Sequence, residues 1–461
     1  MPTQNKIPFE LLAPYNESVA LVGSWDNWQP IAMQRGDDGV WRTDVSLADG
    51  DYQYKFEVIS KSYFAAGQKV TVADPKAIQF TLDSRENSIV RIRGGQRIVS
   101  EYAWKHDNVP LPSNEQLVIY ELHVADFRGG DGDTQQEPGT FAALIEKLDY
   151  LADLGINAIE LMPVNEFPGQ HSWGYAQRSI YAVENSYGSP DDLCRLVDEC
   201  HARGIRVIHD AVYNHMEREA PLTKIDYSYW YYEHNPDAGE LQFGPKFNYE
   251  HFDDNLKRFP ARDHVMGAMK MWIREFHMDG ICFDCTRAIK YFDLLDWLND
   301  EAHREENFSR STLSRSISRR TRRLRAGRPD GCGVARKFLP PAKRHDAGDC
   351  LWGPRPFNTD EMLRLMDGRK DGFISPYNTI HYLGNHDEER TMFLLGDVAN
   401  TFEEGAFRRL KLGATLLLTA AGCRMLWMGE EFGQATNKSL DPRPLSWGLL
   451  NSAHNQGLFN H

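Results

Sequence analysis

The stretch PDDLCRLVDECHARGIRVIHDAVYNH, residues 190–215, decides the fold class of this chain. Its first part, Pro190–Arg203, is typical of a helix that begins with proline and ends at Gly204. The apolar run Ile205–Ile208 follows as a short strand, and the polar run Asp210–His215 comes directly after it. A helix joined by one glycine to a buried strand is the repeating unit of a parallel α/β sheet.

The same alternation continues on both sides of this stretch. Further helices are predicted at Thr140–Leu154 and His264–Phe276, and further strands at Leu117–Tyr120, Ala158–Met162, Ile281–Cys285, Thr379–Leu383 and Arg424–Met428. The repetition predicts an α/β fold, a (β/α)8 TIM barrel with its functional residues at the carboxyl ends of the strands. Barrel strands 5 and 6 do not show in the pattern, and we expect them to be lost or disordered between residues 303 and 356.

Residues 1–104 carry a different pattern, with β-branched and aromatic runs separated by turn residues. The predicted strands are Val19–Val22, Trp41–Val45, Tyr52–Val58 and Ile89–Ile92. They favour a small all-β sandwich in front of a barrel domain over residues 105–461.

The composition limits the class of partner. The 461 residues carry a net charge of −14, which argues against nucleic acid or an anionic membrane. We see no secretory signal at the N-terminus, and charged residues interrupt the most apolar segment, 410–428, so we expect no membrane span and a cytoplasmic location. Seven cysteines without a framework spacing fit free thiols in a reducing compartment.

Acidic clusters stand at the ends of three predicted strands. They are DAVYNH (210–215), GICFD (280–284) and LGNHD (383–387). A single aspartate at a strand end is usually a helix cap or a surface charge. Three clusters on one barrel rim, two of them with histidine, predict a polar site there.

These three motifs resemble signature regions of the α-amylase superfamily. SWGY (172–175), YGSP (187–190) and YELHV (120–124) resemble its branching-enzyme-type and trehalohydrolase-type members. LVGSWDNWQP (21–30) resembles the starch-binding β-sandwich module that precedes the barrel in those enzymes. The resemblance implies a retaining enzyme on α-1,4-glucans (glycogen or starch), either a 1,4-α-glucan branching enzyme or an α-glucan hydrolase, with no cofactor and no metal.

Residue by residue, the resemblance implies that Asp284 is the nucleophile and that Asp387 grips sugar hydroxyls and stabilises an oxocarbenium-like sugar. The substrate-binding residues that it implies are Tyr175, Asp210, His215 and His386. An aromatic insert at about 216–261 either supplies a glucan platform or packs on the barrel. The module's tryptophans likewise either form its core or bind glucan; they are Trp25, Trp28 and Trp41.

Cys282 departs from the family, which carries arginine at this position, two residues before the nucleophile and on its face. A guanidinium there would hold the carboxylate ionised through charge-assisted hydrogen bonds, and a thiol cannot do so. Cys282 and Cys285 also form a C-x-x-C match. Along a strand their side chains point to opposite faces, so this is a weak signal for a metal site.

A second departure covers residues 303–356. The part 307–329 has no acidic residue and is rich in arginine, although the family's acid/base glutamate is expected there. A basic loop that binds an acidic partner is one interpretation. We favour a slip of the reading frame, because permitted codons for 312–324 read one frame over as TIAEHIPEDPAF, which resembles the strand-five region.

The sequence therefore supports two functional hypotheses. One is a retaining α-glucan enzyme that is impaired in this chain, and the other is a catalytically dead α-glucan-binding protein from a damaged gene. We also expect the C-terminal β domain of the family to be absent after residue 461.

Overall fold

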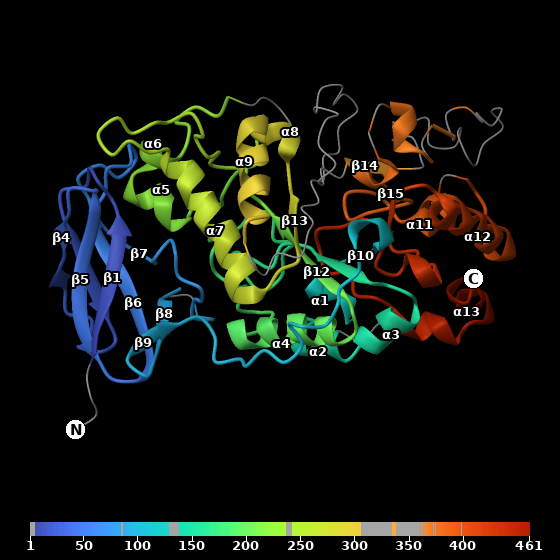
Figure 1. Cartoon of the computed structure of the whole chain (residues 1–461), viewed down its shortest axis with the longest axis horizontal. Coiled ribbons are helices and arrows are strands. Elements are labelled where there is room, and N and C mark those ends of the chain that lie inside the picture. The colour runs from blue at the N-terminus through green and yellow to red at the C-terminus, as the bar shows by residue number, and fades with distance from the viewer. Residues whose placement is uncertain are drawn as a thin grey trace.

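The computed structural model describes residues 5–83, 86–128, 138–236, 242–305, 334–337, 360, 363–364, 366–371, 373, 375–397 and 399–461. Within these ranges an all-β unit from the N-terminal part lies at one end of the molecule, and a curled parallel sheet surrounded by helices forms the rest (Figure 1).

The all-β unit consists of two antiparallel sheets. Their strands are β1 (Asn5–Leu12), β2 (Val19–Gly23), β3 (Ile31–Ala32), β4 (Gln34–Arg35), β5 (Val40–Leu47), β6 (Gly50–Ile59), β7 (Lys69–Val72), β8 (Ser88–Arg93) and β9 (Gln96–Ile98). One sheet has the order β1-β5-β4, and the other has β3-β2-β6-β8-β9 with β7 paired to β6. Trp41 is buried, and its indole N–H donates to the Ala13 carbonyl at 2.8 Å, so this tryptophan belongs to the core. Trp25 packs on Phe9, whereas Trp28 is partly exposed.

The parallel sheet has the order β13-β12-β11-β10-β16-β15-β14. Its strands are β10 (Val118–Leu122), β11 (Ala158–Leu161), β12 (Arg206–Ala211), β13 (Gly280–Phe283), β14 (Val334–Lys337), β15 (Thr379–Tyr382) and β16 (Cys423–Trp427). The α-helices are α1 (Val124–Phe127), α2 (Phe141–Ile145), α3 (Leu148–Asp153), α4 (Pro190–Ala202), α5 (Pro221–Ile225), α6 (Tyr227–Trp230), α7 (Pro260–Phe276), α8 (Thr286–Ile289), α9 (Phe292–Ala302), α11 (Thr391–Asp397), α12 (Glu403–Thr419) and α13 (Ala453–Phe459). The 3-10 helices are η1 (Asn114–Gln116), η3 (Gly368–Asp371), η4 (Pro376–Asn378), η5 (Glu430–Phe432) and η6 (Trp447–Asn451).

The TIM-barrel expectation is confirmed in its strand order, with one correction inside the aberrant segment. Strand β14, within 303–356, pairs in parallel with β15 through the register Val334 to Thr379, at the position of the sixth barrel strand. The backbone of β15 presents amide and carbonyl groups on that side, and any extended chain can pair with them, so this strand is present although we expected its loss. The expected fifth strand falls outside the described residues.

The β unit is joined to the barrel by hydrogen bonds around the β6–β7 connection. The Lys61 N–H donates to the Ile225 carbonyl at 2.9 Å, and the Ser60 hydroxyl donates to the Lys224 carbonyl at 2.7 Å. The buried Asn16 amide bridges the Ile59 and Ile225 carbonyls at 2.9 and 3.0 Å.

The aromatic insert is mostly interior. Tyr229, Trp230 and Tyr231 are each less than 5% exposed and belong to the large hydrophobic core that the two units share. Packing therefore accounts for these three rings, as one of the two interpretations of the insert expected. No helix among the described residues is both long and apolar enough to cross a membrane.

Two buried glutamates face each other in the loops after β11. Glu166 and Glu184 are 3% and 0% exposed. The Asn185 side-chain amide donates to Glu166 at 2.8 Å, and the Phe167 N–H donates to Glu184 at 3.0 Å. Burial and the neighbouring Glu184 charge raise the pKa of Glu166 from its ordinary value of 4.5 to about 9. Burial also raises the pKa of Glu184.

We expect Glu166 to make the protein less stable as the pH rises. Its raised pKa means that the folded state holds a proton that the unfolded state has lost, so this contribution to stability is complete below pH 4.5 and is lost as the pH rises to about 9. Glu166→Gln should flatten that decline and stabilise the protein by at least ~1 kcal/mol at pH 8. Urea unfolding between pH 5 and 9 measures the effect, with exposed Glu115→Gln as the control. If the free energy of unfolding depends on pH in the same way in wild type and Glu166→Gln, the prediction is wrong.

Candidate active site

The three acidic motifs converge at one rim of the parallel sheet. Asp210 lies in β12, Asp284 follows β13, and His386 and Asp387 follow β15. Strands β12 and β13 are neighbours in register, so Asp210 stands opposite Cys282, and the Asp284 N–H donates to the Ala211 carbonyl at 3.0 Å. The carboxyl ends of parallel strands share one edge, which is why motifs far apart in sequence meet here.

The inner face of the sheet is layered from apolar to acidic. One cluster of buried side chains lines the interior: Leu117, Ile119, Ala158, Ile208, Cys282, Ile380, Tyr382, Cys423 and Met425. Two residues further along β10 and β11, Glu121 and Glu160 are paired in register and are 0% and 1% exposed. Alternate residues share a face, so these carboxyl groups extend the acidic layer that Asp210 and Asp284 continue.

Asp210 is buried beneath the rim, with 2% exposure. The Tyr175 hydroxyl donates to its Oδ2 at 2.6 Å, and among the described residues its Oδ1 has no hydrogen-bond partner. Burial raises the pKa of Asp210 well above its ordinary value, and the charges of Asp284 and Glu160 raise it further. The protonated acid is therefore favoured.

Asp284 is half-buried and sits at a sharp change of chain direction. The next residue, Cys285, has a φ of 52° and begins α8. Burial raises the pKa of Asp284, and so does the charge of Asp387, while a hydrogen bond from the Cys285 thiol lowers it. The balance is a carboxyl group with a raised pKa, which is unfavourable for a group that must attack as an anion.

His386 is held by a carboxylate from β10, which is separated from β15 by β16 alone. Its Nδ1 lies 2.8 Å from Glu121 Oε1, and its backbone N–H donates to Glu121 Oε2 at 3.2 Å. The Tyr175 ring stacks on the imidazole at 5.0 Å between centroids. Asp387, by contrast, has a side chain 46% exposed, and the Lys438 ammonium donates to its carbonyl at 2.7 Å.

His215 is a neutral buried imidazole. Its Nε2 donates to the Tyr175 carbonyl at 2.9 Å, and burial lowers its pKa to about 4. Tyr175 therefore contacts three of the other predicted site residues through its hydroxyl, its ring and its carbonyl. The six predicted residues are brought together, and the ring of Tyr175, which we expected to bind substrate, stacks on His386.

Sequence reasoning missed part of the pocket beside this cluster. It is lined by His123, Asp126, Trp173, His386, Glu388, Arg390, Trp427, Met428, Thr436, Asn437, Lys438, Ser439 and Arg443. Most of these residues come from loops after strands, where neither periodicity nor spacing marks them. Glu121 was quoted only as part of a motif; two-residue alternation with Ile119 was the signal that could have placed it on the inner face.

The glutamates after β16 are held away from this pocket. Glu430 accepts from the Thr391 hydroxyl at 2.9 Å. Glu431 accepts from the Tyr120 and Tyr150 hydroxyls, both at 2.9 Å. The acid/base glutamate expected in strand five lies outside the described residues.

Comparison with known proteins agrees with this geometry. Residues 121–260 match the model of the alpha amylase catalytic domain, and residues 14–81 match that of the glycogen recognition site of AMP-activated protein kinase. The chain is thus similar, over these residues, to proteins with an alpha amylase catalytic domain. A malto-oligosyltrehalose trehalohydrolase from Saccharolobus solfataricus is 32% identical over 287 residues, 62% of this chain and 45% of that protein. A 1,4-alpha-glucan branching enzyme from Methylobacillus flagellatus is 26% identical over 98% of this chain and 64% of its own length.

Solved structures extend the likeness in fold to the whole chain. Pullulanase from Anoxybacillus sp. LM18-11, complexed with maltotetraose, has a TM-score of 0.78 at 19% identity and covers 99% of this chain and 72% of that one. Pullulanase from Bacillus acidopullulyticus has a TM-score of 0.77 at 21% identity, covering 100% and 61%. This chain spans 45% and 64% of the two curated relatives named above.

We expect Cys282→Arg to lower the pKa of Asp210 and Asp284. The arginine would stand opposite Asp210 in the β12–β13 register and would offer a donor to its free Oδ1. A guanidinium beside a carboxylate typically lowers its pKa by about 1–3 units. Carboxyl 13C NMR titration measures both groups, and Cys282→Ser, which adds no charge, is the matched control. If Asp210 and Asp284 have the same pKa values in the arginine and serine variants, the missing cation is not the cause of their raised pKa.

Proposed function

We propose that the rim cluster is a site for α-1,4-glucan, with Asp284 placed as the nucleophile of a retaining mechanism. The observation that carries the proposal is the convergence of Asp210, Asp284 and Asp387 with two histidines at the carboxyl ends of β12, β13 and β15. Support comes from the relatives, which include a 1,4-alpha-glucan branching enzyme, and from a pullulanase of the same fold complexed with maltotetraose.

The remaining residues take supporting roles in this proposal. Asp387 is exposed enough to grip sugar hydroxyls, and His386, oriented by Glu121, offers Nε2 on the same side. His215 and Tyr175 hold each other beneath the sugar position, and Tyr175 keeps Asp210 in place. We propose residues 1–104 as a glucan-binding module and residues 105–461 as the barrel domain.

A retaining mechanism also needs a proton donor. One carboxyl attacks the anomeric carbon while a second, about 5–5.5 Å away, protonates the leaving oxygen. Burial raises the pKa of Asp210, but its 2% exposure keeps it away from a leaving group. The expected donor belongs to the segment 303–356, whose arginine-rich part has no acidic residue from 307 to 329.

We therefore propose that this chain is an impaired member of its kind. Cys282 leaves Asp284 without the cation that would keep it ionised, and burial and neighbouring carboxylates raise the pKa of both Asp284 and Asp210. The second candidate is a catalytically dead glucan-binding protein, and the same observation favours it. Binding needs hydrogen bonds between the rim side chains and sugar hydroxyls, but it does not need an ionised nucleophile. Whether an intact form hydrolyses or branches glucan depends on whether water or a sugar hydroxyl intercepts the glycosyl-Asp284 intermediate.

We expect no release or transfer of glucose units from soluble starch, while glucan binding is retained. Loss of a general acid alone typically lowers the rate by about 10²–10⁴-fold. Reducing-end and iodine-stain assays measure hydrolysis and branching separately, and retardation in a glycogen-containing native gel measures binding. Tyr175→Ala should weaken retardation, with exposed Tyr377→Ala in η4 as the control. Turnover that Asp284→Asn abolishes would overturn the impairment, and absence of retardation would overturn glucan binding.

A further inference from the structure

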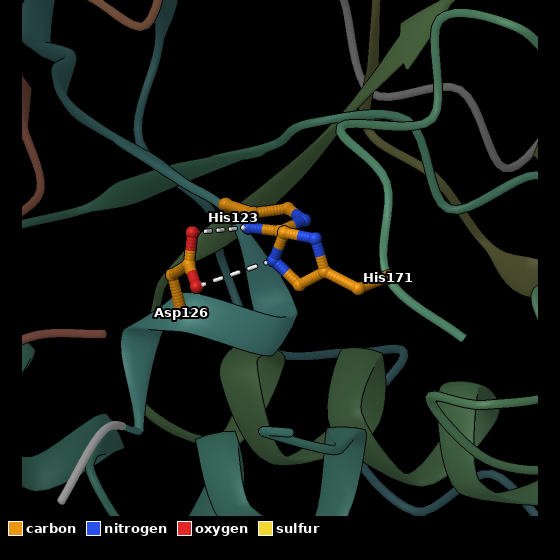
Figure 2. A group of neighbouring side chains, drawn as sticks. All are labelled: His123, Asp126 and His171. Atoms are coloured by element: carbon orange, nitrogen blue, oxygen red, sulfur yellow. Dashed lines mark hydrogen bonds and ion pairs between the residues drawn. The ribbon is translucent and has the colours of Figure 1, made fainter. Parts of the chain in front are cut away.

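A second group of converging ligand atoms lies beside the pocket. His123 follows β10, Asp126 lies in α1, and His171 comes from the long loop between β11 and α4. Figure 2 shows both imidazoles directed at the Asp126 carboxylate. One ligand atom from each residue lies within 4.8 Å of the other two. The His123 and Asp126 side chains are 1% and 5% exposed, and that of His171 is 17% exposed.

Both ring nitrogens of His123 have polar partners. Its Nε2 lies 2.9 Å from the Ser172 carbonyl oxygen and 2.9 Å from the Tyr187 hydroxyl, which can donate or accept. Its Nδ1 lies 3.0 Å from Asp126 Oδ2. In the tautomer with its hydrogen on Nε2, directed at Ser172, the ring presents the Nδ1 lone pair to the Asp126 carboxylate, and a metal ion can then join these two atoms.

We propose that His123 Nδ1, Asp126 and His171 Nε2 bind one zinc ion. Zinc bonds of about 2.0–2.1 Å in a tetrahedral site place neighbouring ligand atoms about 3.4 Å apart. The separations here are 3.0 Å from His123 Nδ1 to Asp126 Oδ2 and 3.4 Å from His171 Nε2 to Asp126 Oδ1. These two contacts end on different oxygens of Asp126, and the three ligand atoms lie within 4.8 Å of one another, so zinc would draw the two imidazoles together. Two imidazoles and one carboxylate suit zinc, whereas calcium and magnesium prefer oxygen ligands.

The surroundings hold these ligands in place. A carbonyl that accepts from the far nitrogen of a metal-bound histidine is the usual support of such a ligand, and Ser172 supplies it. The Arg443 N–H donates to Asp126 Oδ1 at 3.0 Å, and the Leu445 N–H donates to the Asp126 carbonyl at 2.8 Å. His123 and Asp126 also line the pocket, so a fourth zinc position is open to water or a ligand from that side.

The zinc ion would fasten the loop that carries Trp173. His171 is two residues before Trp173, whose ring lies 5.7 Å from that of His386, and both rings line the same pocket. Binding would therefore order one wall of the pocket and raise the stability of the fold. This role does not depend on glucan turnover.

Isothermal titration of zinc chloride into the chelator-treated full chain tests the site. We expect one zinc per chain, and an affinity at least ~10-fold weaker in His171→Ala. His234→Ala, which removes an exposed histidine outside the cluster, should bind as the wild type does. Absence of zinc binding, or equal affinity in wild type and His171→Ala, would overturn the proposal. The second result would assign the zinc to other groups such as the free thiols.

A spectroscopic arm covers the case in which a variant fails to fold. Cobalt added to the wild-type chain should give the intense visible bands of a four-coordinate site, and zinc should displace them. Nitrogen NMR of the histidine rings should show His123 Nδ1 shift on zinc addition. A His123 ring whose Nδ1 carries a proton and does not respond to zinc would show that this proton joins Nδ1 to Asp126, and the proposal would fail.

Discussion

The crowding of carboxyl groups at one end of a parallel barrel is the constraint on which this site depends. The register of β10 to β13 places Glu121, Glu160 and Asp210 on the inner face, and Asp284 follows at the rim. Removing several like charges from water is costly, so each must be protonated or matched by a donor or cation. His386 and Tyr175 match two of them, whereas the position opposite Asp210 holds a thiol in an apolar layer.

The hydrophobic pattern carried enough information to place most of the barrel. The strand expected at Ala158–Met162 is β11, and the helix expected at Pro190–Arg203 is α4, each within one residue at its ends. The pattern did not predict the bounds of every element. The expected helix Thr140–Leu154 divides into α2 and α3 around Lys147. Strand β1 was not predicted, because Pro8 interrupts its strand pattern. An edge strand tolerates a proline, and β1 pairs only with β5.

The candidate site divides in the same way. Asp210, Asp284 and Asp387 were found because each ends an apolar run, and the structure brings them to one rim. The partners that orient and tune them could not be found from spacing. Glu121 and His386 are 265 positions apart, and only the closure of β10 against β16 and β15 makes them neighbours. Nothing local in the sequence distinguishes His171 from other loop histidines.

The junction between the β unit and the barrel has one further consequence. The atoms of Thr223, Lys224 and Ile225 that accept hydrogen bonds from the β unit are main-chain carbonyls. Main-chain acceptors are the same in every residue type, so the barrel side of this joint can change its side chains without losing its bonds, provided that α5 keeps its course. These bonds are thereby insulated from sequence drift in the insert, whereas the Tyr15 hydroxyl, which donates to Asp253 at 2.8 Å, and the core shared with Tyr229 tie the β unit to particular side chains of the insert.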